Sequence, residues 1–233
     1  MKIAVYSLTR DRLKYTQHCF KKMRELAGHP FDHYVWDNGS TDGTPEWLKQ
    51  NEINFKKVTY SPINIGIAGA ANKLLDQIYQ EDYDLIVKID NDCEFLHENT
   101  FKDLARLYTK KYEEMPHSQH WVLSPKVVGI NAQLARSREF YFDKYKISET
   151  GHIGGLFYCT PAKLLQNYRY PTIMPLGYGD DSEASKYLKS KGCLVGYIES
   201  MTVGHYMGTD QQALDYPEYH KRKLEENPIL KKP

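Results

Sequence analysis

Short strand-like segments alternate with helix-like ones through roughly the first ninety residues of the chain. Strands joined by helical crossovers pair in parallel, so this order predicts an α/β fold with a Rossmann-like, mostly parallel central sheet flanked by helices. Thr9 and Thr44 are expected to cap the first two helices, with Pro45 at the first helical position. The strands are expected at 3–8, 31–36, 55–60 and 85–89, and a third helix at about 64–79.

The second half of the chain is less regular. Apolar runs predict strands at 121–123, 155–159 and 194–198, and residues 181–190 fit a helix. After Tyr206 the sequence is polar and contains prolines.

The charges nearly cancel, because 31 Lys and Arg face 30 Asp and Glu for a net charge of +1. No global electrostatic argument therefore favours a nucleic-acid partner. The four cysteines lack metal or redox spacing, which predicts reduced thiols in a cytosolic protein. The N-terminal apolar run is too short for a signal peptide, and no stretch approaches the ~20 apolar residues of a membrane span. We expect a cytoplasmic protein without a transmembrane segment.

Two aspartates, Asp90 and Asp92, follow the fourth expected strand. Because side chains alternate along a strand, Lys88 shares one face with both carboxylates. Open α/β sheets bind ligands at this end of their strands. Neighbouring carboxylates repel unless a cation or donors neutralise them, and their oxygens suit Mg²⁺ or Mn²⁺. A turn built by Asp and Asn is the alternative interpretation.

Further motifs occur in order along the chain: D-N-G-S-T-D-G-T at 37–44, N-I-G-I-A-G-A-A-N at 64–72, D-N-D at 90–92, G-Y-G-D-D at 177–181, and His205. With these motifs the chain resembles the family 2 glycosyltransferases of the GT-A fold, over residues 3 to about 206. The resemblance implies one GT-A domain over 1–206, with a nucleotide-binding half (1–95), an acceptor and catalytic half (96–206), and a C-terminal tail (207–233).

The resemblance implies a nucleoside-diphosphate sugar as donor, UDP-linked. Asp37 would accept the uracil imide N–H or bond a ribose, or it would bond its own backbone in a turn. Gly66 would let a diphosphate approach a helix N-terminus, or it would simply allow the helix to pack closely on the sheet. Lys88 would neutralise phosphate, or pair with Asp90 or Asp37. The residues expected to bind the donor are Thr9, Arg10, Asp37, Asn64, Gly66, Lys88, Asp90 and Gly155.

For the metal, the resemblance implies that Asp92 ligates the cation together with the diphosphate, while Asp90 touches ribose and assists. His205 resembles the late histidine that completes the metal site in related enzymes, although a structural role is the alternative. Neutral imidazole suits Mn²⁺ better than Mg²⁺, so a ligating His205 predicts a preference for Mn²⁺.

For the general base, Asp181 aligns with the acidic residue that deprotonates the acceptor in the family. Asp180 stands where Glu is usual and is the second candidate. Acids in a first helical turn also complement the helix dipole, which is the structural alternative. Gly155, in a glycine pair that follows His152, resembles the acceptor-side strand near the donor sugar, where small residues leave room for substrate.

The predicted function is a metal-dependent, inverting glycosyl transfer to an acceptor hydroxyl, with Asp181 taking the proton. A glycan, lipid-linked or small-molecule acceptor is favoured. A sugar-1-phosphate nucleotidyltransferase is disfavoured, because no glycine follows the first strand. A catalytically inactive module that only binds a nucleotide sugar is disfavoured by the intact Asp180–Asp181 pair.

A DNA-modifying glycosyltransferase that acts on a hydroxylated base is a further alternative. Basic residues interleaved with aromatic ones suit contacts to a nucleic-acid strand, although such stretches are more often solvated surface. The candidates are Arg136, Arg138, Lys144 and Lys146 with Phe140, Tyr141, Phe142 and Tyr145, and the basic run at 220–223.

Overall fold

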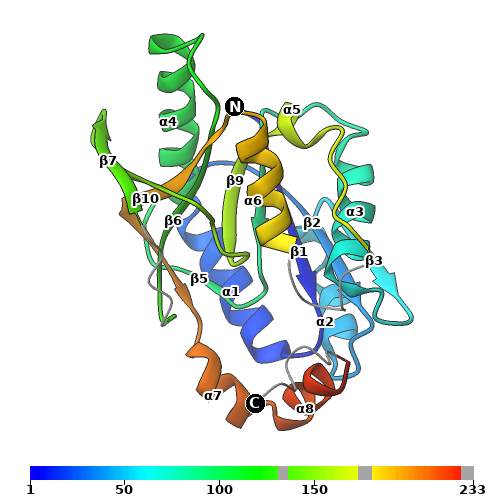
Figure 1. The fold of residues 1–233 in the computed structure, drawn as a ribbon. Coiled ribbons are helices and arrows are strands. Elements are labelled where there is room, and N and C mark those ends of the chain that lie inside the picture. Colours follow the sequence, from blue (N-terminus) through cyan, green and yellow to red (C-terminus); the bar gives the residue numbers. More distant parts are fainter. Residues whose placement is uncertain (131–135, 173–179, 227–233) are drawn as a thin grey trace.

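A computed structural model describes residues 1–130, 136–172 and 180–226. Residues 177–179 of the predicted G-Y-G-D-D motif lie outside these ranges, and the side chain of Asp180 is also outside the described part. The strands form one sheet in the order β3-β2-β1-β4-β9-β6-β10-β8-β7, with β5 paired to β10 (Figure 1). They are β1 (Ile3–Thr9), β2 (Asp32–Asn38), β3 (Lys57–Ser61), β4 (Leu85–Ile89), β5 (Cys93–Phe95), β6 (Trp121–Val128), β7 (Arg136–Phe142), β8 (Tyr145–Thr150), β9 (Phe157–Pro161) and β10 (Leu194–His205).

Helices cover both faces of this sheet (Figure 1). None in the described part of the chain is long and apolar enough to cross a bilayer. The helices are α1 (Leu13–Leu26), α2 (Thr44–Gln50), η1 (Glu52–Asn54), α3 (Gly66–Ile78), α4 (Thr100–Glu114), α5 (Ala162–Leu165), α6 (Asp180–Ser190), α7 (Gly208–Asp215) and α8 (Pro217–Glu226).

The first four strands pair in parallel, as their helical connections predict. Beyond β4 the sheet is mixed: β9 is antiparallel to both β4 and β6, β6 is parallel to β10, and β8 is antiparallel to β10 and β7. A buried strand has the same apolar pattern in either direction, so the sequence did not reveal these orientations. The α/β prediction is confirmed, and the parallel pairing is concentrated in the first half of the chain.

Alternate residues of the buried strands enter two separate cores. In β1, Ile3 and Val5 pack with α1, α2 and α4, whereas Ala4 and Tyr6 pack with α3, α5 and α6 on the opposite face. A strand that is buried on both faces explains why Ile3–Thr9 is almost continuously apolar at its start. The carboxyl end of β1 points toward α7 and α8 (Figure 1).

The two predicted helix caps are wrong. Thr9 is the last residue of β1, and α1 begins after Arg12, whose backbone is left-handed at φ 61°. Gly43 (φ 84°) precedes α2, and Thr44 is already helical. Both threonine hydroxyls donate to carboxylates, Thr9 to Asp37 and Thr44 to Asp42, which explains why neither caps a helix.

Candidate active site

A cavity of about 230 Å³ lies at the carboxyl ends of β1, β2 and β4, where parallel α/β sheets bind ligands. Its lining comes from the turn after β1, the end of β2, the start of α3, the segment after β4, the end of β10, and helices α7 and α8. The predicted site residues that line it are Thr9, Arg10, Asn64, Asp90, Asp92 and His205.

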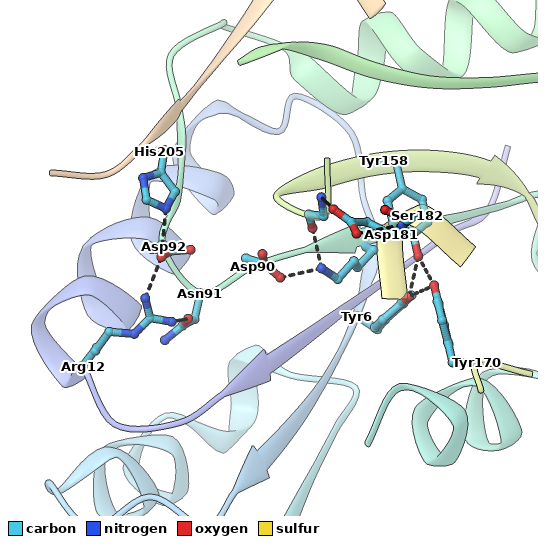
Figure 2. A network of polar contacts seen from close by, with 12 residues as sticks. Tyr6, Arg12, Asp90, Asn91, Asp92, Tyr158, Tyr170, Asp181, Ser182 and His205 are labelled. Carbon is cyan, nitrogen blue, oxygen red and sulfur yellow. Dashed lines mark hydrogen bonds and ion pairs between the residues drawn. The ribbon is translucent and has the colours of Figure 1, made fainter. Parts of the chain in front are cut away.

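Asp92 is buried and surrounded by hydrogen-bond donors (Figure 2). Arg12 Nη1 and Gln212 Nε2 donate to Asp92 Oδ2 at 2.6 and 2.9 Å. Arg12 Nη2 also donates to Asn91 Oδ1 at 2.6 Å. Burial alone would raise the pKa of Asp92, but the Arg12 charge and the hydrogen bonds from His205 and Gln212 hold it well below its usual range. These contacts favour the ionised form of Asp92.

His205 reaches the same carboxylate from the end of β10. Its Nε2 lies 3.5 Å from Asp92 Oδ2, because β10 pairs His205 with Cys93, the neighbour of Asp92. Burial would lower the pKa of His205, yet the Asp92 carboxylate raises it above its usual value. His205 Nδ1 is buried without a hydrogen-bond partner among the described residues.

An aspartate oxygen and an imidazole nitrogen this close fit two adjacent positions around a Mn²⁺ ion. Among the described residues, no group of three or more His, Cys, Asp or Glu side chains is arranged to hold a metal. Asp92 and His205 would therefore supply only part of a cation's ligands, and their role as metal ligands stays a prediction. The Arg12 guanidinium contacts the same Asp92 oxygen.

Asp90 forms a salt bridge with Lys88. Lys88 Nζ lies 2.8 Å from Asp90 Oδ1 and also donates to the carbonyl of Gly155. This is one of the salt bridges that the sequence left open for Lys88, which is buried with only 3% of its surface exposed. Figure 2 shows Asp90 between the Asp92 cluster and Asp181.

Asp181 lies near Lys88, in the first turn of α6. Its carboxylate accepts the backbone N–H of Gly155 at 3.0 Å and that of Ser182 at 2.7 Å. His152 Nε2 is 3.5 Å from Asp181 Oδ2. Burial would raise the pKa of Asp181, but His152 and the Lys88 charge lower it below its usual value. These contacts orient the Asp181 carboxylate and favour its ionised form.

Three tyrosine hydroxyls form a buried cluster that Figure 2 shows near Asp181. Tyr6 Oη lies 3.1 Å from Tyr158 Oη and 2.9 Å from Tyr170 Oη, and the latter two hydroxyls also bond each other. Asn72 binds the backbone N–H and carbonyl of Tyr170 through its side chain. These contacts fasten the segment around Tyr170 to β1, β9 and α3.

Asp37 makes the turn contacts that the sequence offered as the alternative to base binding. It is 2% exposed and accepts the Thr9 hydroxyl and the Ser40 backbone N–H, each at 3.1 Å, and also the Ser40 hydroxyl. Burial raises the pKa of Asp37. The structure thus joins Thr9 to Asp37 at the ends of β1 and β2, and their contacts to a donor stay a prediction.

Asn64 and Gly66 form the turn that starts α3. Asn64 Oδ1 accepts Asn38 Nδ2 at 2.7 Å and the Gly66 backbone N–H at 3.0 Å. Gly66 has φ +79°, a left-handed conformation that favours glycine. Asn64 lines the cavity, as does Ile67 from the first turn of α3. The N-terminus of α3 therefore lies at the cavity.

The sequence did not reveal the cavity residues Arg12, Gln212 and Tyr219, and Lys223 was considered only within the basic run of the DNA alternative. Arg12 reaches the cavity because of its left-handed backbone, which has no clear sequence signature in a residue other than glycine. The C-terminal residues reach it because the expected tail contains two helices that fold back on the sheet end.

The first segment considered for the alternative of DNA contact forms the β7–β8 hairpin, and its basic side chains are in ion pairs. Phe140 and Phe142 pack against Trp121, and Tyr145 is buried, so these rings belong to the core. Tyr141 is 74% exposed. The ion pairs are Arg136 with Glu199, Arg138 with Glu149, Lys144 with Asp103, and Lys146 with Glu139.

The sequence model of glycosyl transferase family 2 matches residues 5–157. The chain belongs to this family. The match spans β1 to the start of β9 and includes the D-N-D motif. No curated protein sequence matches the chain. Membership of glycosyl transferase family 2 confirms the resemblance and leaves the nucleotidyltransferase alternative without support.

Solved glycosyltransferases share this fold. TarS of S. aureus superposes with a TM-score of 0.68 at 16% identity, over 94% of this chain and 38% of that one. TarS residues 1–349 in complex with UDP-GlcNAc superpose with a TM-score of 0.67 at 16% identity, over 88% of this chain and 58% of that one. The mannosyltransferase PcManGT from Pyrobaculum calidifontis, in complex with GDP-Man and Mn²⁺, superposes with a TM-score of 0.62 at 15% identity, over 87% of this chain and 56% of that one.

These likenesses show the fold, and they confirm the predicted GT-A architecture of this family 2 chain. The chain spans between 38% and 65% of the lengths of the TarS chains that it matches.

Proposed function

We propose that this family 2 member transfers a sugar from a UDP-linked donor to an acceptor hydroxyl, with inversion and with dependence on Mn²⁺ or Mg²⁺. The observation that carries the proposal is the convergence of Asp92 and His205 beside a cavity at the carboxyl ends of β1, β2 and β4. Two structural neighbours support it: TarS binds UDP-GlcNAc, and PcManGT binds GDP-Man with Mn²⁺. Residues 1–206 would form the catalytic domain, in the cytoplasm.

The donor would occupy the cavity, with its diphosphate near Arg10 and the N-terminus of α3. Asp92 and His205 would hold the metal, with Asp90 beside the ribose. When bound, the metal supplies Lewis-acid stabilisation of the departing diphosphate. His205 would favour Mn²⁺ over Mg²⁺, because a nitrogen ligand suits the softer ion better.

Asp181 would act as the general base. The backbone N–H groups of Gly155 and Ser182 orient its carboxylate, and His152 stands beside it. A lowered pKa keeps Asp181 ionised, and the acceptor hydroxyl becomes acidic only as its oxygen bonds the anomeric carbon. The hydroxyl proton would pass to Asp181 while the bond to the nucleoside diphosphate breaks. Asp180 is the second candidate.

Thermal unfolding with UDP, GDP and ADP, each with and without Mn²⁺, tests the donor site. We expect UDP with Mn²⁺ to stabilise the chain, by about 2.7 kcal/mol at a hundredfold the Kd. Asp92→Asn should remove the Mn²⁺-dependent part and leave the metal-free shift. If no nucleoside diphosphate shifts the unfolding midpoint, the proposed donor site is wrong.

Asp181→Asn tests the catalytic step separately from binding. We expect this variant to bind UDP with Mn²⁺ as the wild type does, while release of UDP from a UDP-sugar falls about 10²- to 10⁴-fold. Equal turnover by the variant would exclude Asp181 as the base. A wild-type chain that binds UDP-sugars without any turnover, with every acceptor class offered, would instead be a silent binding module.

The proposed acceptor is a glycan, a lipid-linked sugar or a small molecule. DNA is disfavoured, because the hairpin cations Arg136, Arg138, Lys144 and Lys146 already pair with carboxylates. Phosphate contacts would make acceptor binding strongly salt-dependent, so acceptor affinity measured across salt concentrations separates the two classes.

A further inference from the structure

The C-terminal helices α7 and α8 are fastened to the end of the sheet that carries the cavity. From α7, Gln212 bonds both Arg12 and Asp92, and Asp215 accepts the Tyr15 hydroxyl at 2.5 Å. From α8, Arg222 pairs with Asp11, a carboxylate in the turn after β1 whose side chain is only 3% exposed. These contacts reach the turn after β1, helix α1 and the D-N-D motif.

One face of α8 turns toward the cavity. Tyr219 and Lys223, four residues apart and therefore on one side of the helix, both line it. Arg12 Cζ lies 4.8 Å from the centre of the Tyr219 ring, and Arg12 also donates to Asp92, so the ring stands beside this ion pair. Lys221 is two residues from Lys223, is exposed, and does not line the cavity.

The two carboxylates that line the cavity already form ion pairs with cations of the protein itself. Asp92 pairs with Arg12, and Asp90 pairs with Lys88. A nucleoside diphosphate adds at least two negative charges. The proposed metal ion and Arg10, which also lines the cavity, would offset part of this charge, and the two internal pairs offset none of it. Lys223 lines the same cavity and, unlike Arg12 and Lys88, has no carboxylate partner among the described residues.

We propose that α8 completes the donor site, with Lys223 binding the diphosphate of the nucleotide and Tyr219 forming the adjoining wall. This inference rests on the proposed function, because it names a further residue for the same donor. It assigns the C-terminal segment to donor binding and not to DNA. An ammonium on a flexible stem can follow the phosphates as they enter, which suits an exposed position such as that of Lys223.

Titration calorimetry with UDP and with uridine, both in the presence of Mn²⁺, tests the inference on the full chain. We expect Lys223→Ala to weaken UDP binding about tenfold, the typical effect of one charge-assisted hydrogen bond. Uridine, which lacks phosphate, should lose less than about twofold, and Lys223→Arg should retain most of the UDP affinity. The matched control Lys221→Ala removes the same charge from the same helix and should leave both affinities unchanged.

Unfolding midpoints of the ligand-free variants should equal that of the wild type, because Lys223 has no ion pair to lose among the described residues. If Lys223→Ala and Lys221→Ala bind UDP with equal affinity, Lys223 does not bind the diphosphate. The same conclusion follows if Lys223→Ala reduces the affinities for UDP and uridine by the same factor. A wild-type chain that binds no UDP overturns the proposed donor itself and this inference with it. Normal wild-type binding with an unaffected Lys223→Ala overturns the inference alone.

Discussion

The ion pair between Arg12 and Asp92 lends itself to a quantitative test. Their side chains are only 12% and 6% exposed, and their charged atoms are 2.6 Å apart. Replacing Arg12 by Gln removes the cation and leaves the Asp92 carboxylate buried. Breaking a buried pair in this way typically costs about 3–5 kcal/mol. We expect about 3 kcal/mol, because Gln212 and His205 still contact the carboxylate.

For a domain of this size, about 3 kcal/mol corresponds to a fall of roughly 6–12 °C in the unfolding midpoint. Urea unfolding followed by circular dichroism measures the free energy directly. The matched control is the same substitution in an Asp92→Asn background, where no buried charge is left unpaired. The cost of Arg12→Gln should then shrink to about 1 kcal/mol or less.

Mn²⁺ provides a second measurement on the same variants. In the wild type, a cation at Asp92 would compete with the Arg12 guanidinium, which donates to one oxygen of that carboxylate. We expect Mn²⁺ to raise the unfolding midpoint of Arg12→Gln more than that of the wild type, and to leave Asp92→Asn unaffected. Equal costs of Arg12→Gln in the two backgrounds would refute the reasoning, because the guanidinium would then not be neutralising Asp92.

Two further predictions concern other parts of the structure. An added Cβ at Gly155 would lie 2.8 Å from Lys88 Nζ, so Gly155→Ala should displace this buried lysine, cost about 1–3 kcal/mol, and reduce sugar transfer. Gly154→Ala is the control, since nothing lies within 4 Å of its added methyl, and equal unfolding energies for the two variants would contradict the argument. Burial would raise the pKa of Asp103, but hydrogen bonds from His97, Lys144 and Tyr145 lower it in the folded state. Ionised Asp103 therefore stabilises the fold above its unfolded pKa of about 3.9, and this stabilisation is lost as the pH falls through the lower folded-state pKa. Urea midpoints between pH 6 and pH 3 should therefore fall more steeply for the wild type than for Asp103→Asn, and parallel curves would show that Asp103 contributes nothing.

The first half of the chain was predictable because its order depends on local patterns. Each of β1, β2, β3 and β4 lies within about two residues of its predicted position, since an apolar run between turn signals marks a buried strand. Helix α4 and the hairpin β7–β8 were not assigned, although both are regular. The hairpin is mostly polar and at the sheet edge, and its pairing with β10 is a long-range contact that no local pattern specifies.

The site was predictable only in part, for a related reason. Asp92 and His205 were grouped from motifs, and the antiparallel pairing of β5 with β10 brings them within 3.5 Å. Arg12 reaches Asp92 through a left-handed residue at the start of α1, and Gln212 reaches it from a helix 120 residues away in sequence. Such contacts depend on the tertiary fold, so composition and spacing do not reveal them.

The contacts of the two carboxylates have a consequence for how a donor would bind. Arg12 and Gln212 bind Asp92, and Lys88 binds Asp90, so a metal or nucleotide bound at these carboxylates would compete with these partners. Gln212 belongs to α7, which is packed against α1, so such competition at Asp92 would change contacts that fasten the C-terminal helices. Substitutions on the cavity face of α8 should consequently change donor affinity more than they change folding stability.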